Sequence, residues 1–578
     1  MTSPLLENGT RIRTERGRNV RVIDHVRRAS QKDIYRVECG GRQLALKWFD
    51  KNAFGGHRLD DIRDSLRRQA ELGPLGQSLL WPLDVTREVN GSFGYLEELV
   101  RPEEYADLLA LFRETNRFPS MSVAIDACLD VVSAFRRVHE VGYSFQAVNY
   151  ETVLVDPRTG RVLVVADTNV LPEGAATWQG GPHVFMAPER AVNYYSSATV
   201  RAASDLHSIA AIVFRLLLRQ DPLFGKRYES RPSDVDWVIW ESEIYGSNPL
   251  FVFDPDDTSN GLTDDSRGDA LRLWPILPER MRAFFCRAFS QEALHDPSKR
   301  PSELEWMREL VLLRSELVRC SCGTETFRDG AKPIRCTNCG RMCECKLRID
   351  VGGVQIPIEG DVRIHRCQLK SVRTAKEALD QQLLVTRSPQ DPAQLLLRNV
   401  SGHPWYTELR GRVQSVNPGQ SIQATDGLGL SILGRVVRIH KNDQVDPTTR
   451  NERHTAPLDE PVLAAGEHLT LDQAVSLALG RRGGVALSDA HVLLAFALDY
   501  MDQASPELRV LQNCCEDKLL APFSEAWAKA RDLEGATREA FDWLREQCYV
   551  AEEPARIVVE GIAHGIRADL QRRGRSSA

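Results

Sequence analysis

Five short motifs follow one another over the first 300 residues, and together they constrain the fold of this chain more than any other feature. In chain order they are LALKWF (44–49), the segment 94–99, MAPER (186–190), SDLHSIAAIVFRLLL (204–218) and HDPSKRPS (295–302). Any one of them could arise by chance, whereas all five in this order indicate a single kind of domain.

The pattern around these motifs places strands first and helices after them. Residues 20–50 read as strand segments with a Gly-Gly turn at 40–41, followed by a polar helical stretch from about 57 to 72. From residue 105 onward apolar residues recur at helical spacing, and helices dominate to about residue 317. This order predicts a two-lobed α+β domain over residues 1–317.

The motifs make residues 1–317 resemble the protein kinase superfamily, which implies a bilobal protein-kinase-like fold. By this resemblance, Lys47 would pair with nucleotide phosphates, and Asp167 in VLVVADTN would hold the metal. Asp205 would be the buried residue that opens a long helix, and Arg300 would form a salt bridge with Glu189 of the Ala-Pro-Glu motif.

The stretch GYSFQAVNYETVLVD (142–156) departs from the catalytic loop of the family, His-Arg-Asp followed five residues after the Asp by Asn. Registered on the hairpin that follows, the triplet becomes Phe145-Gln146-Ala147 and the asparagine becomes Thr152, while Asn149 replaces the usual lysine. Ala147 cannot accept a proton, and general-base help of this kind is worth roughly 10²–10⁴ in rate. We therefore assign no catalytic residue and interpret the domain as a pseudokinase.

The glycine-rich loop of the family is also missing, because Arg27, Ala29 and Lys32 stand where glycines would sit. A basic side chain there could attract phosphate, or it could fill the nucleotide cleft and exclude ATP. Lys47 and Asp167 remain as a nucleotide-binding pair for ATP and Mg, or as a salt bridge that holds the lobes together. The helix carboxylate expected to pair with Lys47 is one of Asp61, Asp64 and Glu71.

Seven of the thirteen cysteines fall within 48 residues: Cys320, Cys322, Cys336, Cys339, Cys343, Cys345 and Cys367. The first four form two close pairs separated by a 13-residue loop, the spacing of a zinc ribbon with one shortened knuckle. We expect these four thiolates to bind a structural zinc ion. Cys343, Cys345 and Cys367, with His365, could replace a ligand or form a second site.

The rest of the chain divides by composition into smaller parts. We expect a zinc-ribbon-like domain at 318–368, a helical connector at 369–394, a small β-rich module at 395–442, a linker at 443–465 and an α-helical interaction domain at 466–578. No run of about 18 apolar residues and no secretory signal is present, so we expect a cytoplasmic protein without a membrane span. The net charge of -6 provides no global attraction for nucleic acid.

A kinase-like domain followed by a zinc ribbon and a β module is similar to one bacterial architecture, the kinase component of the tellurite-resistance-associated (TerY-type) phosphorylation triad. The similarity covers roughly residues 10–442 and is carried by LALKWF, SLLWPLDV, MAPER, DPLFG, RCSCGTETF…RCTNCG and LLLRNVSGHPWYTEL…VNPGQSIQA. It implies two protein partners, a von Willebrand factor A protein and a PP2C-type phosphatase, and a role in stress response or defence.

Three hypotheses follow. The first is a catalytically impaired scaffold or signalling protein that binds partner proteins and retains some nucleotide binding. The second is an active, atypical serine/threonine kinase that uses ATP and Mg through Lys47 and Asp167. The third is a nucleic-acid-associated regulator that acts through the ribbon, and we rank nucleic acid below protein as the partner.

Overall fold

The computed structural model describes most of the chain up to residue 441 and parts of the C-terminal region. The described residues are 6–28, 32–49, 56–101, 103–112, 118–177, 180–192, 197–263, 269–327, 334–343, 347–351, 354–358, 362–391, 393–409, 412–441, 469–482, 517–529, 533–546 and 552–576, with residues 487, 493, 501, 505, 507 and 511. The chain forms two compact units. The first comprises Met1–Pro404, Leu409–Gly429 and Val437–Gln444, and the second comprises Trp405–Glu408, Leu430–Val436 and Val445–Ala578.

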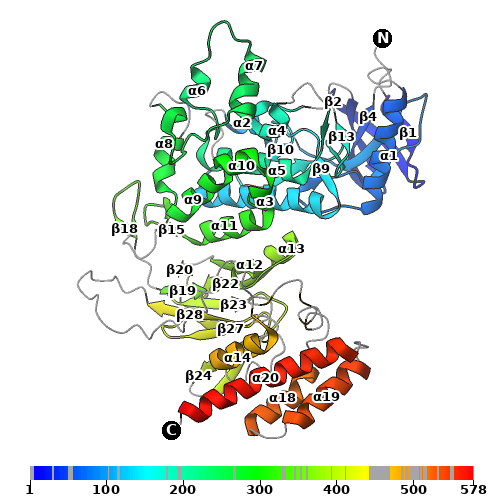
Figure 1. The fold of residues 1–578 in the computed structure, drawn as a ribbon. Coiled ribbons are helices and arrows are strands. Elements are labelled where there is room, and N and C mark those ends of the chain that lie inside the picture. Colours follow the sequence, from blue (N-terminus) through cyan, green and yellow to red (C-terminus); the bar gives the residue numbers. More distant parts are fainter. Residues whose placement is uncertain are drawn as a thin grey trace. The chain divides into compact units, whose positions relative to one another are not determined.

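The N-terminal lobe is a six-stranded antiparallel sheet with one long helix, as the sequence predicts (Figure 1). The strands lie in the order β1-β2-β3-β4-β7-β6. Their bounds are β1 Arg11–Arg13, β2 Asn19–Arg28, β3 Lys32–Cys39, β4 Arg42–Phe49, β6 Asp84–Val85 and β7 Gly94–Glu98, and helix α1 is Gly56–Leu72. Leu59 and Leu66 of α1 pack against Phe49 and Tyr95, while other apolar side chains of the sheet form a separate core.

The helical lobe is built around two buried helices, α3 (Met121–Glu140) and α5 (Ala202–Leu218) (Figure 1). Ser120 caps the N-terminus of α3 by accepting a hydrogen bond from the Val123 backbone N–H. A capping box of Ser302 and Glu305 begins α11 (Glu303–Ser315), which packs against α3. The shorter helices are α2 Leu108–Phe112, α4 Pro188–Ala191, α6 Lys226–Glu229, α7 Trp237–Ser242, α8 Ala270–Leu273, α9 Glu279–Ala288 and α10 Gln291–His295.

Short strands bring the loops after residues 145 and 165 next to each other. Strand β9 (Tyr143–Phe145) pairs with β12 (Val170–Pro172). Strand β10 (Val153–Val155) pairs with β11 (Val162–Val165), and β11 runs parallel to β5 (Leu79–Leu80). The remaining short strands are β8 Ala106–Asp107, β13 Ala176–Thr177 and β14 Ala198–Thr199. This pairing places Asp167 beside the segment that holds Ala147 and Thr152.

Beyond residue 317 the predicted boundaries are wrong in two respects. The expected helical connector at 369–394 contains strand β22 (Gln381–Arg387), and only two four-residue helices, α12 (Arg366–Leu369) and α13 (Ala375–Ala378), lie nearby. The charged residues around QQLLVTR suggested a helix, but Leu383 and Val385 are fully buried in a sheet. That sheet also contains β21 Arg363–His365, β23 Leu395–Asn399 and β26 Ser421–Gln423.

The second error concerns the ends of the ribbon and the β module. Strands β19 (Leu347–Val351) and β20 (Val354–Ile358) were assigned to the ribbon, yet β19 pairs along its length with β28 (Arg435–Lys441). The β module therefore begins before residue 395. In the second unit, β24 (Trp405–Leu409) pairs with β27 (Gly429–Ile432) at Tyr406–Ser431 and Thr407–Leu430. Strand β25 (Arg412–Val416) belongs to the first unit.

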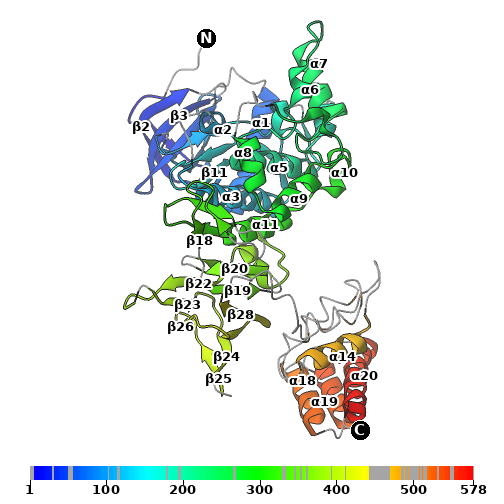
Figure 2. The same ribbon diagram turned by 90° about the vertical axis from the view of Figure 1, so that its left-hand side faces the viewer.

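The C-terminal region is helical where the structure describes it (Figure 2). Helices α14 (Leu471–Arg482), α18 (Asp517–Lys529), α19 (Leu533–Glu546) and α20 (Glu552–Ser576) enclose a core of their own. The predicted linker at 443–465 lies outside the described residues. Among the described helices, none is long and apolar enough to cross a membrane.

A buried histidine connects three helices of the lobe. His139 of α3 places Nε2 3.0 Å from Asp205 Oδ2 of α5, and its Nδ1 contacts Glu303 of α11. Burial opposes the charged imidazolium, but hydrogen bonds to the two carboxylates outweigh it and raise the pKa of His139 to about 9. Both ring nitrogens therefore donate at neutral pH.

This pKa predicts a stability that falls as the pH rises. Because the pKa of His139 is higher in the folded state than its ordinary value of about 6.5, its contribution is complete below that value and is lost as the pH approaches 9. The loss amounts to about 3 kcal/mol. Urea unfolding at pH 6 and at pH 9 measures this loss as a difference in the free energy of unfolding. In His139→Gln most of that difference between the two pH values should disappear. If His139→Gln shows the same difference as the wild type, the raised pKa of His139 is not its cause.

Candidate functional site

A cavity of about 690 Å³ lies between the N-terminal sheet and the helical lobe. Its apolar lining includes Ile34, Ala45, Leu80, Leu154 and Val165. Its polar lining includes Lys32, Lys47, Glu97, Gln146, Thr152 and Asp167. The volume and the mixed lining are those of a small-molecule site.

Lys47 lies in β4 and is buried between two carboxylates. Its Nζ is 2.6 Å from Asp167 Oδ2 and 2.7 Å from Glu97 Oε1. The expected partner on helix α1 was wrong, because Glu97 comes from β7, the strand beside β4. The register of these strands puts Lys47 opposite Tyr95, so the inward-pointing Glu97 two residues later reaches the lysine.

Lys32, at the start of β3, adds a second ammonium group to the same carboxylate. Its Nζ lies 3.4 Å from Asp167 Oδ2, 2.9 Å from the Tyr95 hydroxyl and 3.4 Å from Thr168 Oγ1. The sequence left two roles open for a basic residue here, attracting phosphate or filling the cleft, and Lys32 reaches into the cleft. Arg27 also lines the cavity, whereas Ala29 lies outside the described residues.

Both oxygens of Asp167 are occupied by donors from the protein. Oδ2 contacts Lys32 and Lys47 and accepts a hydrogen bond of 2.5 Å from the Tyr95 hydroxyl. Oδ1 accepts bonds of 2.5 Å from the Thr168 backbone N–H and 3.3 Å from its hydroxyl. Burial opposes ionisation of this carboxyl, but the two ammonium groups outweigh it and hold the pKa of Asp167 far below its usual range.

Glu97 is the least satisfied member of this cluster. Its Oε1 faces Lys47, while its buried Oε2 has no hydrogen-bond partner among the described residues. Burial raises the pKa of Glu97, and Lys47 offsets only part of that shift. Burial likewise lowers the pKa of Lys32, whereas Asp167 and Glu97 raise the pKa of Lys47 against its own burial.

The segment around Ala147 is held in place but carries no acid or base at that position. Ala147 is buried, and the backbone N–H of Phe145 donates to Asp205 Oδ2 at 2.9 Å. Gln146 donates to the Thr168 carbonyl at 2.8 Å and accepts from the Thr177 hydroxyl at 3.1 Å. These bonds fix the loop against the Asp167 segment without supplying a proton acceptor for a substrate hydroxyl.

Thr152 does not offer a free oxygen in place of the missing asparagine. Its Oγ1 accepts from the Asn149 backbone N–H at 2.9 Å and from Asn169 Nδ2 at 3.3 Å, and it donates to Asn149 Oδ1 at 3.2 Å. With Asp167 also saturated, the side chains at the two expected magnesium positions do not fit a divalent cation, which needs oxygen ligands that are free to coordinate.

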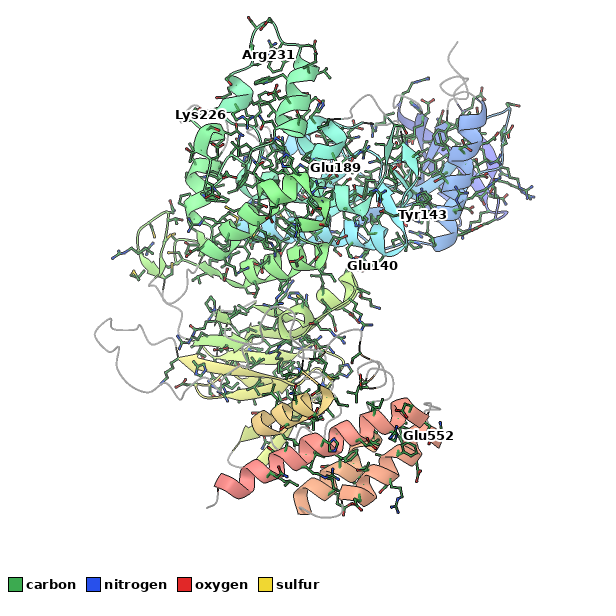
Figure 3. The ribbon with its side chains drawn as sticks, viewed as in Figure 1. Glu140, Tyr143, Glu189, Lys226, Arg231 and Glu552 are labelled. Atoms are coloured by element: carbon green, nitrogen blue, oxygen red, sulfur yellow. The ribbon has the colours of Figure 1, made fainter. Side chains whose placement is uncertain are left out.

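The residues expected to stabilise the helical lobe are brought together. Arg300 Nη1 lies 3.0 Å from Glu189 Oε1, and its Nη2 lies 2.7 Å from Oε2, a bidentate pair. Figure 3 labels Glu189 within this lobe and Tyr143 at the start of β9. Asp205 is buried and bonds to Phe145 and His139 as described above.

The four cysteines of the expected ribbon come together at the tips of two hairpins, β15–β16 (Leu317–Arg319, Glu325–Phe327) and β17–β18 (Ile334–Arg335, Met342–Cys343). Their sulfurs all lie within 4.8 Å of one another, with Cys320–Cys339 at 3.6 Å and Cys322–Cys336 at 3.5 Å. Four thiolates around zinc at 2.3 Å would be about 3.8 Å apart, so the donor set fits a tetrahedral metal ion such as zinc.

The turns suit this arrangement, because Gly323 and Gly340 have φ of +90° and +70°. Among the described residues, no other group of three His, Cys, Asp or Glu side chains is close enough to hold a metal. Cys367 is buried, Cys343 lies in β18 and His365 in β21, while Cys345 lies outside the described residues. The predicted second site therefore stays a prediction.

Glu97, Tyr95 and the contact of Lys32 with Asp167 were not predicted from the sequence. The segment YLEELV did contain a signal, because alternation along a strand places one of two consecutive glutamates inward. Only the register with β4 shows that this glutamate is Glu97.

The chain was compared with protein families, curated proteins and solved structures. No protein-family model and no curated protein matches the chain. Among solved structures it is similar to the kinase domain of PknI from Mycobacterium tuberculosis, determined as a double mutant, with 17% identity over 54% of this chain and 100% of that chain and a TM-score of 0.35. Residues 6–317 bring together two pairs that the kinase resemblance predicts, Lys47 with Asp167 and Glu189 with Arg300.

Replacing each of two adjacent glutamates tests how much the buried cluster around Lys47 contributes to stability. Glu97 is 3% exposed beside Lys47, whereas Glu98 is 52% exposed beside Arg42. Glu97→Ala should lower the free energy of unfolding by about 3 kcal/mol, because it removes one partner of a buried ion pair. Glu98→Ala should change it by about 0.5 kcal/mol or less. Chemical denaturation measures both, and equal losses would contradict the role given to Glu97.

Proposed function

We propose that residues 1–317 form a pseudokinase that acts by binding other proteins rather than by transferring phosphate. The observation that carries this proposal is the state of Asp167, whose two oxygens accept from or pair with Lys32, Lys47, Tyr95 and Thr168. A carboxylate saturated in this way cannot hold a metal ion without breaking a buried network.

The missing base supports the same proposal. Ala147 stands where a side chain would have to accept the proton of a substrate hydroxyl. Among the described residues that line the cavity near Gln146 and Asn149, the only carboxylates are those of Glu151 and Asp167, and there is no imidazole. Glu151 is exposed at the edge of the cavity, and Asp167 is already ion-paired. Lys47 and Asp167 therefore act first as a salt bridge between the lobes.

Nucleotide binding, where it occurs, would not depend on magnesium. Lys32 and Lys47 already provide two positive charges at Asp167, so a nucleotide phosphate would compete with the carboxylate for those ammonium groups. An active kinase using ATP and Mg through Lys47 and Asp167 would need this cluster to open, and we rank it second.

We also propose that Cys320, Cys322, Cys336 and Cys339 hold a structural zinc ion. Bound there, zinc would close the two hairpins on each other and would leave no open coordination position for chemistry. The hairpins also contact the helical lobe, since Glu325 of β16 accepts from the backbone N–H and the hydroxyl of Ser122 at 2.8 Å each. The ion would thus help to fix a docking surface.

The partners we propose are proteins of a bacterial phosphorylation system in stress response or defence. The resemblance noted in the sequence implies a von Willebrand factor A protein and a PP2C-type phosphatase. The support within this chain is that the lobe-stabilising contacts of Glu189 and Asp205 are present while the catalytic positions are not.

A phosphoryl-transfer assay tests the pseudokinase directly. The full chain is incubated with γ-labelled ATP and Mg²⁺ or Mn²⁺, alone and with a general protein substrate, and incorporation of label is measured. We expect the same background incorporation from the wild type and from Asp167→Asn, and the same thermal shift with ATP in Mg²⁺ as in EDTA. Incorporation by the wild type clearly above that of Asp167→Asn would contradict the proposal.

Metal analysis tests the zinc ion. Protein purified under reducing conditions should contain about one zinc per chain, and Cys336→Ser should lose it together with thermal stability. Cys286→Ser is the matched control, because Cys286 is a half-buried thiol of the helical lobe that donates to the Phe253 carbonyl at 3.8 Å. Zinc retained at full occupancy by Cys336→Ser would exclude this site.

A further inference from the structure

A second cavity of about 800 Å³ lies apart from the cleft that holds Asp167. Its walls come from α3, the turn at 159–161, α11, the β15–β16 hairpin and strands β21 and β22, all within Met1–Pro404 of the first unit. The volume lies in the range of small-molecule sites, and neither the kinase-like resemblance nor the zinc proposal assigns it a role.

The lining of this cavity is rich in arginine. Five guanidinium groups contribute to it, those of Arg161, Arg314, Arg319, Arg363 and Arg387. Three carboxylates stand against them, those of Asp126, Asp130 and Glu325. The lining therefore carries an excess of positive charge even when all three carboxylates are ionised.

The carboxylates are largely engaged by other groups. Asp126 Oδ1 accepts from Arg314 Nε at 3.2 Å, and Glu325 accepts from the backbone N–H and hydroxyl of Ser122. Burial raises the pKa of Asp130 to about 6, so part of its charge is lost near neutral pH.

Two of the arginines act on the lining carboxylates only at longer range, Arg161 on Asp130 and Arg363 on Asp126. Arg161 and Arg363 are exposed, and within the described part of the chain neither forms a salt bridge. They come from different walls, the first from the turn that precedes β11 and the second from β21. Arg363 also acts on His365, because burial, Arg363 and Arg314 together lower the pKa of that imidazole to about 4.

We propose that this cavity binds a small molecule that carries phosphate groups. Planar guanidinium groups match phosphate oxygens in bidentate geometry and remain charged at any physiological pH. Arg161 belongs to the helical lobe, Arg319 to the cysteine hairpin and Arg363 to the β segment, so one polyanion contacting all three would tie these parts together. Such a ligand would regulate the domain by fixing these three parts together, without any catalytic step.

Calorimetric titration of the full, zinc-loaded chain tests this site. The probes are tripolyphosphate, ADP and glucose 6-phosphate, which separate inorganic, nucleotide and sugar phosphates. We expect saturable binding of at least one probe, and Arg161→Ala and Arg363→Ala should each weaken it by about fivefold or more. Arg158→Ala is the matched control, because Arg158 lies on the same turn, is 77% exposed, pairs with Asp156 and does not line the cavity.

The outcomes separate this site from the Asp167 cleft. Binding that Arg363→Ala weakens and that Lys47→Met and Arg158→Ala leave intact supports the proposal, whatever the phosphoryl-transfer assay shows. The proposal is overturned if none of the three probes binds, if Arg158→Ala weakens binding as much as Arg363→Ala, or if binding depends on Lys47 rather than on Arg161 and Arg363.

Discussion

The carboxylate of Asp167 is the point on which the two lobes of the kinase-like region depend. It follows β11 of the helical lobe, and it is held by Lys47 of β4 and Lys32 of β3, two strands of the N-terminal sheet. Inside a cavity with an apolar lining, such an ion pair is strong only while every partner stays in place, and losing one partner of a buried pair costs about 3–5 kcal/mol. The contacts that join the lobes also occupy one oxygen of Asp167, while the other accepts from Thr168.

The helical lobe is organised by charged groups that do not line the cavity that holds Asp167. Glu189 and Arg300 form a bidentate pair, and His139 bonds to Asp205 and Glu303 on two other helices. Asp205 also fixes the backbone of Phe145, two residues before Ala147. The loop is thus held in a defined position although Ala147 supplies no acid or base there.

Much of the lobe architecture and of the site could be predicted from the sequence, because the motifs report local structure. MAPER and HDPSKRPS identified Glu189 and Arg300, and paired cysteines with glycine turns identified the four thiols that lie close enough to hold a metal ion. Glu97 was missed because its meeting with Lys47 depends on strand register, which separates it from its equally acidic neighbour Glu98. Strand β22 was not predicted because its buried apolar run is short and is flanked by charged residues. The pairing of β19 with β28 was not predicted because it joins residues some 90 positions apart, which no local pattern encodes.

The most direct test of this account is a crystal structure of the chain soaked with ATP and Mn²⁺, using the anomalous signal of manganese to locate the metal. The account predicts that Lys32 and Lys47 still contact Asp167 and that no manganese peak lies within coordination distance of its oxygens. A manganese ion bound by Asp167, with Lys32 displaced from the cleft, would contradict it.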